Sequence, residues 1–455
     1  MTAMLKCAVL VIGGGSAGVG AAWRAALCGA DTVLIEPGAL LGGTSTLGGV
    51  NEWEPGVASF GLNRRLYARL DEKSAGIGRG PAPCAEKHIG LNRIDRTLTY
   101  VDTLRRAGAG ADKWARVQFE PIYMAAAMDA ELRAAGVRIL YHTRADSVIA
   151  RGECIEGVEA TDGVSRRTFR IAADAVIDCT GDAVIARMAG CRTLLGEDAH
   201  SRFGEPSAPE TAGGALNGVT VMFRAAPGRV GDETPRWAYE CENARHWLER
   251  NKPASHVTEY PNGDRCFNPL PIMTGEDYFA IEDADERRKI ALARTYLYWQ
   301  WMKEECGHGG WHIAGMAARD GVRESLRLDA LSMLAEREVR GGFRRQGGEI
   351  IALADHALDT HSAGAGPKEL ESAYGVPMGC LIAREYANLL VAGRCCGLSH
   401  IAAASCRLSR TMMDLGEAAG ALAAQGGDLR EGRAEKVRGA LDFERYLDWA
   451  DKLYR

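Results

Sequence analysis

Short apolar runs flank a helical pattern at the start of the chain. Residues 6–12 (KCAVLVI) and 32–36 (TVLIE) are continuous apolar runs, which is typical of strands buried on both faces of a parallel sheet. Between them, the alanine-rich spacing of residues 16–29 predicts a helix. The chain is therefore expected to open with a β-α-β unit.

The same alternation continues to about residue 190 and returns near the C-terminus. We predict a helix over 122–135, strands over 137–142, 145–150, 155–160 and 171–178, a late strand over 389–392 and a helix over 408–425. Between these blocks, helical patterns such as 284–305 are frequent and strand patterns are fewer. This shift in pattern predicts a second, inserted domain.

Taken together, the patterns predict an α/β protein with a Rossmann-like parallel sheet and an inserted mixed α/β cap. We place the first domain at residues 1–190 plus 375–430 and the cap, or substrate domain, at 191–374. Residues 431–455 are expected to form a peripheral helical tail.

Composition narrows the class of protein. The 455 residues include 46% hydrophobic and 25% charged residues, a balance that supports a large buried core. A net charge of −5 gives no support for a general nucleic-acid or anionic-membrane surface. The 13 cysteines include no C-x-x-C pair, and no uninterrupted apolar stretch is long enough for a spanning helix. We therefore expect a soluble cytoplasmic protein.

The turn after the first apolar run has the spacing of a dinucleotide-binding loop. Gly13-Gly14-Gly15-Ser16-Ala17-Gly18 fits G-x-G-x-x-G, in which glycines allow a tight turn, close approach of a pyrophosphate and close packing of helix on strand. The helix that follows would direct its first N–H groups at the phosphates. Glu36 closes the second strand, where a carboxylate binds ribose hydroxyls and disfavours a 2′-phosphate.

A second motif distinguishes the cofactor. Gly42-Gly43-Thr44-Ser45, six residues past Glu36, resembles the extended motif of the FAD-binding two-dinucleotide-fold superfamily, which includes glutathione reductase and fumarate reductase. Residues 119–149, 174–190 and 389–424 then resemble successive blocks of the bacterial FAD-dependent oxidoreductase family, related to fumarate reductase flavoproteins. Residues 218–223 and 321–327 resemble its blocks in the cap.

The resemblance implies roles for individual residues around FAD. Gly13, Gly15, Ser16, Ala17 and Gly18 would hold the pyrophosphate, Glu36 the ribose, and Gly42, Gly43, Thr44 and Ser45 the pyrophosphate and ribitol. The backbone of Ala145 would meet the adenine, and Thr180, Gly181 and Asp182 would close over the cofactor. Gly393 and Arg394 would lie by the ribitol, and a helix opening near Leu415, Gly416, Ala418 and Ala419 would point at the flavin.

Two absences and one departure qualify this picture. Segment 42–51 contains no His or Cys, so FAD is expected to bind non-covalently. No second G-x-G-x-x-G follows a strand, so no dedicated NAD(P)H domain is visible and the electron donor or acceptor stays open. Arg394 stands where relatives of fumarate reductase commonly carry an acid, which leaves the ribitol contact open.

Candidate catalytic residues follow from what flavin chemistry requires. FAD carries the redox chemistry, and the protein must orient the substrate and move protons. His400 is proposed as acid or base and Arg407 as an orienting cation, because both belong to a block that the family places beside the flavin. Arg323 is a third candidate, near the substrate. A loop-bonding histidine, a buried ion pair and a salt-bridged helix face are the respective alternatives.

Other reactive residues favour structural roles. His308 and His312 have ligand spacing, but the glycines between them disfavour a rigid metal site, so no metal is expected. Trp299, Trp301 and Trp311 could line a pocket, although core packing is the commoner role of such residues. Cys395 and Cys396 are expected to be small buried apolar residues, because a disulfide between adjacent cysteines is strained.

The sequence thus predicts an FAD-dependent oxidoreductase that transfers a hydride between a small organic substrate and the flavin. A tRNA-modifying flavoprotein of the same superfamily and an electron-relay subunit of a complex are the two alternatives. The expected partners are a small-molecule substrate and an unidentified electron donor or acceptor. A second copy of the chain is a further candidate partner.

Overall fold

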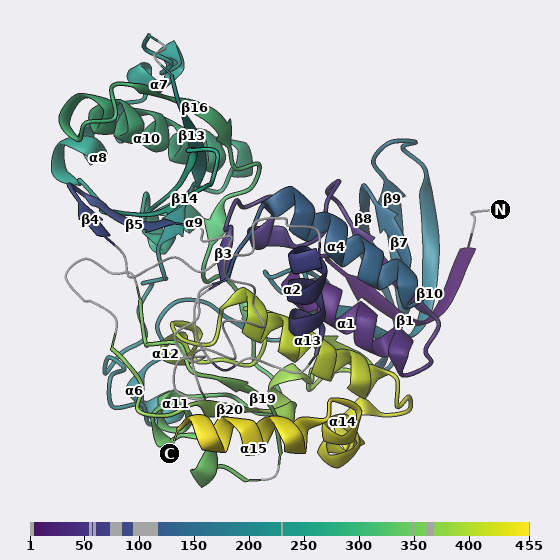
Figure 1. Cartoon of the computed structure of the whole chain (residues 1–455). Coiled ribbons are helices and arrows are strands. Elements are labelled where there is room, and N and C mark those ends of the chain that lie inside the picture. The colour runs from purple at the N-terminus through teal and green to yellow at the C-terminus, as the bar shows by residue number, and fades with distance from the viewer. Residues whose placement is uncertain are drawn as a thin grey trace.

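A computed structural model gives the fold of the chain (Figure 1). It describes residues 4–53, 57, 61–72, 84–93, 117–228, 231–347, 349–360 and 368–454. Two lobes are visible in Figure 1: a large one that contains both ends of the chain and a smaller one at the upper left.

A seven-stranded sheet forms the centre of the large lobe. Its order is β7-β2-β1-β10-β9-β8, with β21 also paired to β10. Strands β7, β2, β1, β10 and β21 are parallel, and β9 and β8 are antiparallel. The strands are β1 (Met4–Ile12), β2 (Thr32–Glu36), β7 (Arg138–Tyr141), β8 (Thr143–Arg151), β9 (Cys154–Asp162), β10 (Thr168–Asp178) and β21 (Leu389–Val391).

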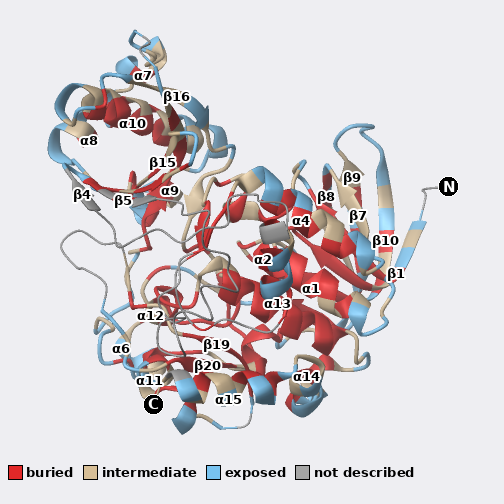
Figure 2. Cartoon of the chain, viewed as in Figure 1, coloured by how far each residue is buried: buried red, intermediate tan, exposed pale blue. Residues whose placement is uncertain are grey.

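The observed strands confirm the predicted Rossmann-like sheet. Val9, Leu10 and Val11 are at most 1% exposed because the middle of β1 is covered on both faces. The helices α1 (Ser16–Leu27), α4 (Pro121–Ala134) and α13 (Ser409–Ala423) cover one face (Figure 2). Each lies within two residues of its predicted bounds.

Helices α1 and α13 pack unusually close to each other. A Cβ atom at Gly416 would lie 1.9 Å from the carbonyl oxygen of Ala17, and one at Gly420 would lie 2.2 Å from that of Ala21. Glycine at these positions therefore lets two backbones touch. The long gap in sequence between the helices is closed by β21, which brings the C-terminal part of the chain back to β10.

A mixed sheet forms the smaller lobe, the cap, in the order β16-β13-β15-β14-β5-β4. Its strands are β4 (Cys84–Glu86), β5 (Ile89–Arg93), β13 (Phe223–Pro227), β14 (Ser255–Glu259), β15 (Arg265–Pro269) and β16 (Trp311–Met316). Helices α7 (Arg236–Glu240), α8 (Glu242–Arg250) and α10 (Ala284–Glu305) lie against it (Figure 1). Trp299 of α10 is 1% exposed and meets Phe223 and Phe267 edge-on at 5.2 and 5.3 Å.

The strand pairing of the cap differs from the division expected from the sequence. Strands β4 and β5 come from residues 84–93, inside the segment assigned to the first domain, yet β5 pairs with β14 in parallel register. Their dark blue colour in Figure 1 marks this early origin. Strands this short show little periodicity, so the sequence could not predict which sheet they would join.

The last part of the predicted cap instead joins the large lobe. Strands β19 (Ile350–Ala354) and β20 (Tyr374–Pro377) pair with each other, and Ile351 and Val376 belong to the same buried cluster as Val9 of β1. The expected tail forms two helices, α14 (Ala434–Ala440) and α15 (Phe443–Leu453), rather than one. Phe443 is 2% exposed beside β19, so α15 contributes to the core.

Shorter elements complete the described part of the chain. The remaining helices are α2 (Leu62–Glu72), α5 (Val184–Met188), α6 (His200–Phe203), α9 (Gly275–Ala280), α11 (Glu336–Gly341) and α12 (His400–Ala403). The remaining strands form the pairs β3 (Glu52–Trp53) with β6 (Val117–Gln118), β11 (Thr193–Leu194) with β18 (Arg327–Leu328), and β12 (Val219–Thr220) with β17 (Gly321–Val322). None of the helices over the described residues is long and apolar enough to cross a membrane.

Candidate functional site

A cavity of about 960 Å³ lies between the carboxyl edge of the parallel sheet and the cap. Its walls come from the ends of β1, β2 and β10, the turn after β21, the start of α13 and one face of the cap sheet. The crevice outside the carboxyl ends of the strands is where open α/β sheets bind ligands. The cavity is large enough for a cofactor with a small molecule beside it.

The glycine loop has the shape that a dinucleotide requires. Gly13 has a φ of +98°, and a Cβ there would lie 2.6 Å from the carbonyl oxygen of Cys179. A Cβ at Gly18 would lie 1.8 Å from the carbonyl oxygen of Gly13, so the helix packs directly on the loop. A Cβ at Gly15, by contrast, would meet no atom within 4 Å, which leaves the loop open to a phosphate.

Unpartnered polar atoms support the same assignment. Ser16 lines the cavity, and its Oγ is buried without a hydrogen-bond partner among the described residues. A buried hydroxyl without a partner is costly, and a phosphate oxygen at the start of α1 would satisfy it. Gly13, Gly15, Ser16 and Ala17 all line the cavity, whereas Gly18 lies behind the loop. The loop therefore fits a pyrophosphate.

Glu36 lies at the end of β2 and lines the cavity as predicted. Its Oε2 accepts a hydrogen bond from the N–H of Gly14 at 2.8 Å, and its Oε1 accepts from Gly38 at 2.7 Å. The cap contributes Arg319, whose Nη2 is 2.6 Å from Oε1. Arg319 also lines the cavity, so the cap reaches the end where the ribose was predicted.

The second glycine motif is only partly exposed to the cavity. Gly43 and Thr44 line it, while the N–H of Gly42 donates to Gly14 O at 2.8 Å and joins the two loops. Ser45 is fully buried: its Oγ donates to Ser409 Oγ at 3.0 Å and accepts from the indole of Trp53 at 2.8 Å. Gly42 and Ser45 therefore hold the loop in place from behind.

The wall beside the glycine loop is built on Asp178. This buried carboxylate accepts hydrogen bonds from the backbone N–H groups of Thr180, Ile185 and Ala186 at 2.8 to 3.0 Å. Burial raises its pKa. The turn that follows places Thr180, Gly181 and Asp182 along the cavity, together with Ala145 from β8.

Arg394, which stands where the resemblance led us to expect an acid, is paired with Asp182. Gly393 and Arg394 line the cavity, and Nη2 of Arg394 is 2.6 Å from Oδ1 of Asp182. Ser325 Oγ donates to the same oxygen at 2.5 Å. The acid that related proteins carry after the glycine is thus replaced by an arginine paired with an acid from another loop. Arg394 Nε has no hydrogen-bond partner within the part of the chain that the structure describes.

The part of α13 that faces the cavity is its first turn, and not the stretch near Leu415 that the resemblance implied. Leu408, Ser409, Arg410 and Met412, at the start of α13, line the cavity. The predicted residues Leu415, Gly416, Ala418 and Ala419 lie in the middle of α13 and do not line it; they are buried in the core. The predicted assignment was therefore displaced by about two turns, because a helix binds anions at its first turn and not along its length.

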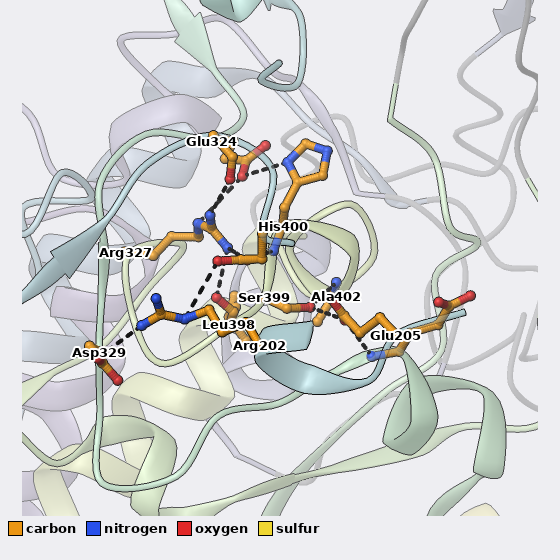
Figure 3. Close-up of polar contacts among 12 residues, drawn as sticks. Arg202, Glu205, Glu324, Arg327, Asp329, Leu398, Ser399, His400 and Ala402 are labelled. Carbon is orange, nitrogen blue, oxygen red and sulfur yellow. Dashed lines mark hydrogen bonds and ion pairs between the residues drawn. The ribbon is translucent and has the colours of Figure 1, made fainter. Parts of the chain in front are cut away.

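His400 does not line the cavity. Figure 3 shows its polar contacts. Its ring points toward Glu324, with Nδ1 3.0 Å from Oε1, and its backbone N–H donates to Asp198 at 3.0 Å. Arg327, which is fully buried, pairs with both of these carboxylates. His400 is 7% exposed, so the structure favours the loop-bonding role that the sequence left open.

The other two catalytic candidates do face the cavity. Arg323 donates from Nη1 to the carbonyl oxygen of Gly218 at 2.7 Å and to Thr220 Oγ1 at 2.9 Å. Arg407 donates to the carbonyl oxygens of Ala404 and Asp359 at 3.2 and 2.8 Å. No helix forms around Arg323, so the salt-bridged helix considered for it does not exist: residues 321–322 and 327–328 are strands.

The electrostatics of Arg323 are unusual for a buried guanidinium. Over the described residues it forms no ion pair with a carboxylate. Burial, followed by the positive charge of Arg407, lowers its pKa to about 9, against a smaller opposing effect of Asp359. The group remains charged at neutral pH. A cavity that contains two cations in this arrangement favours an anion.

Sequence reasoning missed the cap side of the cavity. Alternate residues of β14 and β15 face it: His256 and Thr258 on one strand, Cys266 and Asn268 on the other. Asn51, the last residue of segment 42–51, and Glu52, which follows it, complete this side. The period-two spacing was the available signal, but nothing in the sequence indicated which face of the cap sheet would meet the first domain.

The tryptophans and the adjacent cysteines singled out in the sequence lie outside the cavity. Trp299, Trp301 and Trp311 do not line it, and His308 packs against Phe267 at 5.4 Å. Cys395 and Cys396 are fully buried, as predicted. Among the described residues no group of three or more His, Cys, Asp or Glu side chains could hold a metal ion.

A family model described as FAD dependent oxidoreductase matches residues 8–440. A geranylgeranyl bacteriochlorophyll reductase-like structure from Thermoplasma acidophilum is similar at 13% identity and a TM-score of 0.49, over 99% of this chain and 87% of that chain. A flavoprotein/dehydrogenase from Cytophaga hutchinsonii shows 13% identity and a TM-score of 0.45, over 98% of this chain and 86% of that chain. The structure of a myxobacterial chondrochloren halogenase shows 12% identity and a TM-score of 0.45, over 99% of this chain and 81% of that chain. No curated protein matches the chain.

Proposed function

We propose that this chain, which belongs to the FAD dependent oxidoreductase family and uses FAD, transfers a hydride between a small anionic organic molecule and non-covalently bound FAD. When bound, the flavin supplies a two-electron acceptor or donor for the substrate carbon. The chain itself must bind the cofactor, hold the substrate in a fixed orientation and move a proton.

The observation that carries this proposal is the placement of Arg323 and Arg407. Both face the cavity that also contains the glycine loop. Backbone carbonyls of Gly218 and Asp359 and the hydroxyl of Thr220 hold the two guanidinium groups in fixed positions. A carboxylate or phosphate of the substrate would offset the charge that Arg407 imposes on Arg323. Cations held in advance bind an anion with little loss of side-chain entropy.

The proposal is tested by anaerobic flavin reduction with pairs of compounds that differ in charge. Purified holoprotein is mixed with 2-hydroxy acids and amino acids, and separately with their neutral amides and alcohols. The reduced protein is mixed with 2-oxo acids and unsaturated acids. We expect the flavin absorption to bleach or recover with anions only. Equal response to the neutral partners would contradict the anionic substrate, and no response to any compound would contradict hydride transfer and favour an electron-relay subunit.

A variant separates substrate binding from cofactor binding. Replacing Arg323 with Met should raise the substrate concentration for half-maximal reduction about 10- to 100-fold, the size expected when a charge-assisted hydrogen bond is lost. The Kd for FAD should stay within about threefold of the original. The control is Arg236→Met, because the Arg236 side chain is 92% exposed on α7. A loss of FAD with unchanged substrate dependence would place Arg323 in the cofactor site instead.

A further inference from the structure

A histidine–carboxylate pair lies at the contact between the cap and the large lobe. His256 is on β14 of the cap, and Glu52 is on β3, directly after the predicted flavin segment 42–51. The distance from His256 Nε2 to Glu52 Oε1 is 2.7 Å. Both side chains line the cavity. The pair therefore joins two parts of the chain that the sequence separates by about two hundred residues.

The carboxylate is fixed from behind. Glu52 is paired with Gln118 in the short ladder of β3 and β6, and the Gln118 side-chain amide donates to Glu52 Oε2. Gln118 is fully buried, and the Glu52 side chain is 6% exposed. With one oxygen bound by Gln118, the other is directed at His256. The side chain of His256 is more open, at 24% exposed.

This arrangement selects one form of the imidazole ring. A carboxylate accepts hydrogen bonds, so the neutral ring carries its hydrogen on Nε2 and donates it to Glu52. The lone pair then belongs to Nδ1, the ring nitrogen that does not contact Glu52. A carboxylate behind a histidine also stabilises the imidazolium that forms when Nδ1 takes a proton.

The pair lines the same cavity as the arginine that we propose binds the substrate anion. Thr220 Oγ1 accepts from Arg323 at 2.9 Å and donates to the carbonyl oxygen of Pro269 at 2.9 Å. In the ladder of β14 and β15, Pro269 stands opposite Ser255, and Asn268 stands opposite His256. A path of contacts therefore runs from the arginine through the Thr220 hydroxyl and Pro269 to Asn268, which stands opposite the histidine on the neighbouring strand.

We propose that His256, positioned by Glu52, is the residue that exchanges a proton with the substrate during hydride transfer. This inference rests on the proposed function. In the oxidation of a hydroxy or amino acid, the C–H bond breaks and its hydrogen leaves with both electrons as a hydride to the oxidised flavin. The O–H or N–H bond breaks, its proton goes to Nδ1 of His256, and its electron pair forms the C=O or C=N bond.

The charges balance within the site. The substrate loses two electrons and the flavin gains them, while the proton on His256 makes an imidazolium beside the Glu52 carboxylate. In the reverse direction, the imidazolium returns this proton to the oxygen or nitrogen as the hydride reaches carbon. Glu52 is a positioning residue, because it acts through His256 and not on the substrate.

The kinetic test compares His256 with a histidine outside the cavity. His256→Asn should lower the limiting rate of anaerobic flavin reduction by about 10²- to 10⁴-fold, the range for loss of a general base. The Kd for FAD should stay within about threefold. His246 on α8, whose side chain is 56% exposed, provides the matched variant His246→Asn, for which we expect a rate within about threefold of the original. Added imidazole should restore part of the rate to His256→Ala.

Two kinetic outcomes would overturn the inference. One is an unchanged limiting rate in His256→Asn, and the other is an equal loss in His256→Asn and His246→Asn. Glu52→Gln should lower the rate less than His256→Asn, by about 10- to 100-fold, because it keeps the side-chain shape and removes the charge. A rate in Glu52→Gln equal to that of the unchanged protein would remove the positioning role.

A second measurement does not depend on any substrate. Isotope-edited NMR of the histidine rings in the holoprotein, at mildly alkaline pH, should show His256 with its hydrogen on Nε2 and an unprotonated Nδ1. Glu52→Gln should shift this population toward the other form. A ring that carries its hydrogen on Nδ1 would overturn the inference. If no compound reduces the flavin of the unchanged protein, the proposed function fails, and the ring form still decides whether the pair is arranged as stated.

Discussion

Nη2 of Arg394 lies 2.6 Å from Oδ1 of Asp182, and this ion pair joins the turn after β21 to the turn after β10. Both residues line the cavity, and Ser325 from the cap side of the chain donates to the same carboxylate oxygen. Three segments far apart in sequence therefore meet at one acid beside the cofactor cavity.

Removal of this acid should weaken cofactor binding. Asp182→Ala leaves Arg394 without its partner and free to change position, so we expect the Kd for FAD to rise about 3- to 10-fold; partial exposure of the Asp182 side chain limits the effect. The measurement is quenching of flavin fluorescence when the apoprotein is titrated. Asp31→Ala, which removes an exposed pair with Arg138, is the control and should leave this Kd unchanged.

The glycine loop tolerates no side chain at Gly18. A Cβ there would lie 1.8 Å from the carbonyl oxygen of Gly13, so Gly18→Ala must push the helix off the loop. We expect loss of FAD from the purified protein and a fall in stability of about 1–3 kcal/mol from overpacking. Flavin content and thermal unfolding measure these effects. Gly439→Ala, on α14 with no atom near its Cβ, should retain FAD, and equal loss in both variants would contradict the prediction.

His400 should prove to be structural. His400→Ala leaves the buried Glu324 with one partner fewer, so we expect a fall in the free energy of unfolding of about 1–3 kcal/mol. The limiting rate of flavin reduction should stay within about threefold, because the ring does not line the cavity. Chemical denaturation and anaerobic stopped-flow measurements check the two effects. A large loss of rate at unchanged stability would return His400 to the active site.

The cysteines should differ sharply in reactivity. The thiolate is the reactive form, and burial raises the pKa of the Cys395 thiol to about 12, so almost none is ionised in mildly alkaline buffer. Burial also raises the pKa of Cys396 and, less strongly, that of Cys28. We expect a thiol reagent to label exposed Cys154 first and Cys395 and Cys396 only after unfolding. Peptide mapping over time measures the order, and early labelling of Cys395 would contradict it.

The cofactor half of the site could be predicted from the sequence because its signals are local. Gly13, Gly15 and Glu36 fall within one β-α-β unit, where strand, turn and helix fix their relative positions before any other part of the chain is placed. Thr180 and Asp182 follow the end of β10 in the same way. Each of these residues lines the cavity.

Closeness along the sequence did not predict which side chains face the cavity where tertiary packing set their direction. His400 and Arg407 are seven residues apart, yet only Arg407 faces the cavity, because α12 turns the His400 ring toward Glu324. Gly416 looked like part of a flavin-facing turn, but its lack of a side chain serves the close contact of α13 with Ala17 of α1. A glycine motif does not show which backbone approaches it.

The sequence by itself determined the parallel sheet, the dinucleotide loop and the class of cofactor, since each depends on residues that are near neighbours along the chain. Only the tertiary structure decided the substrate side: it brought β5 into the cap sheet, paired Glu52 with His256, and left Arg323 facing the cavity without a carboxylate partner among the described residues. These contacts join segments up to about two hundred residues apart. Their formation depends on how two lobes pack, and no periodicity within either lobe encodes that contact.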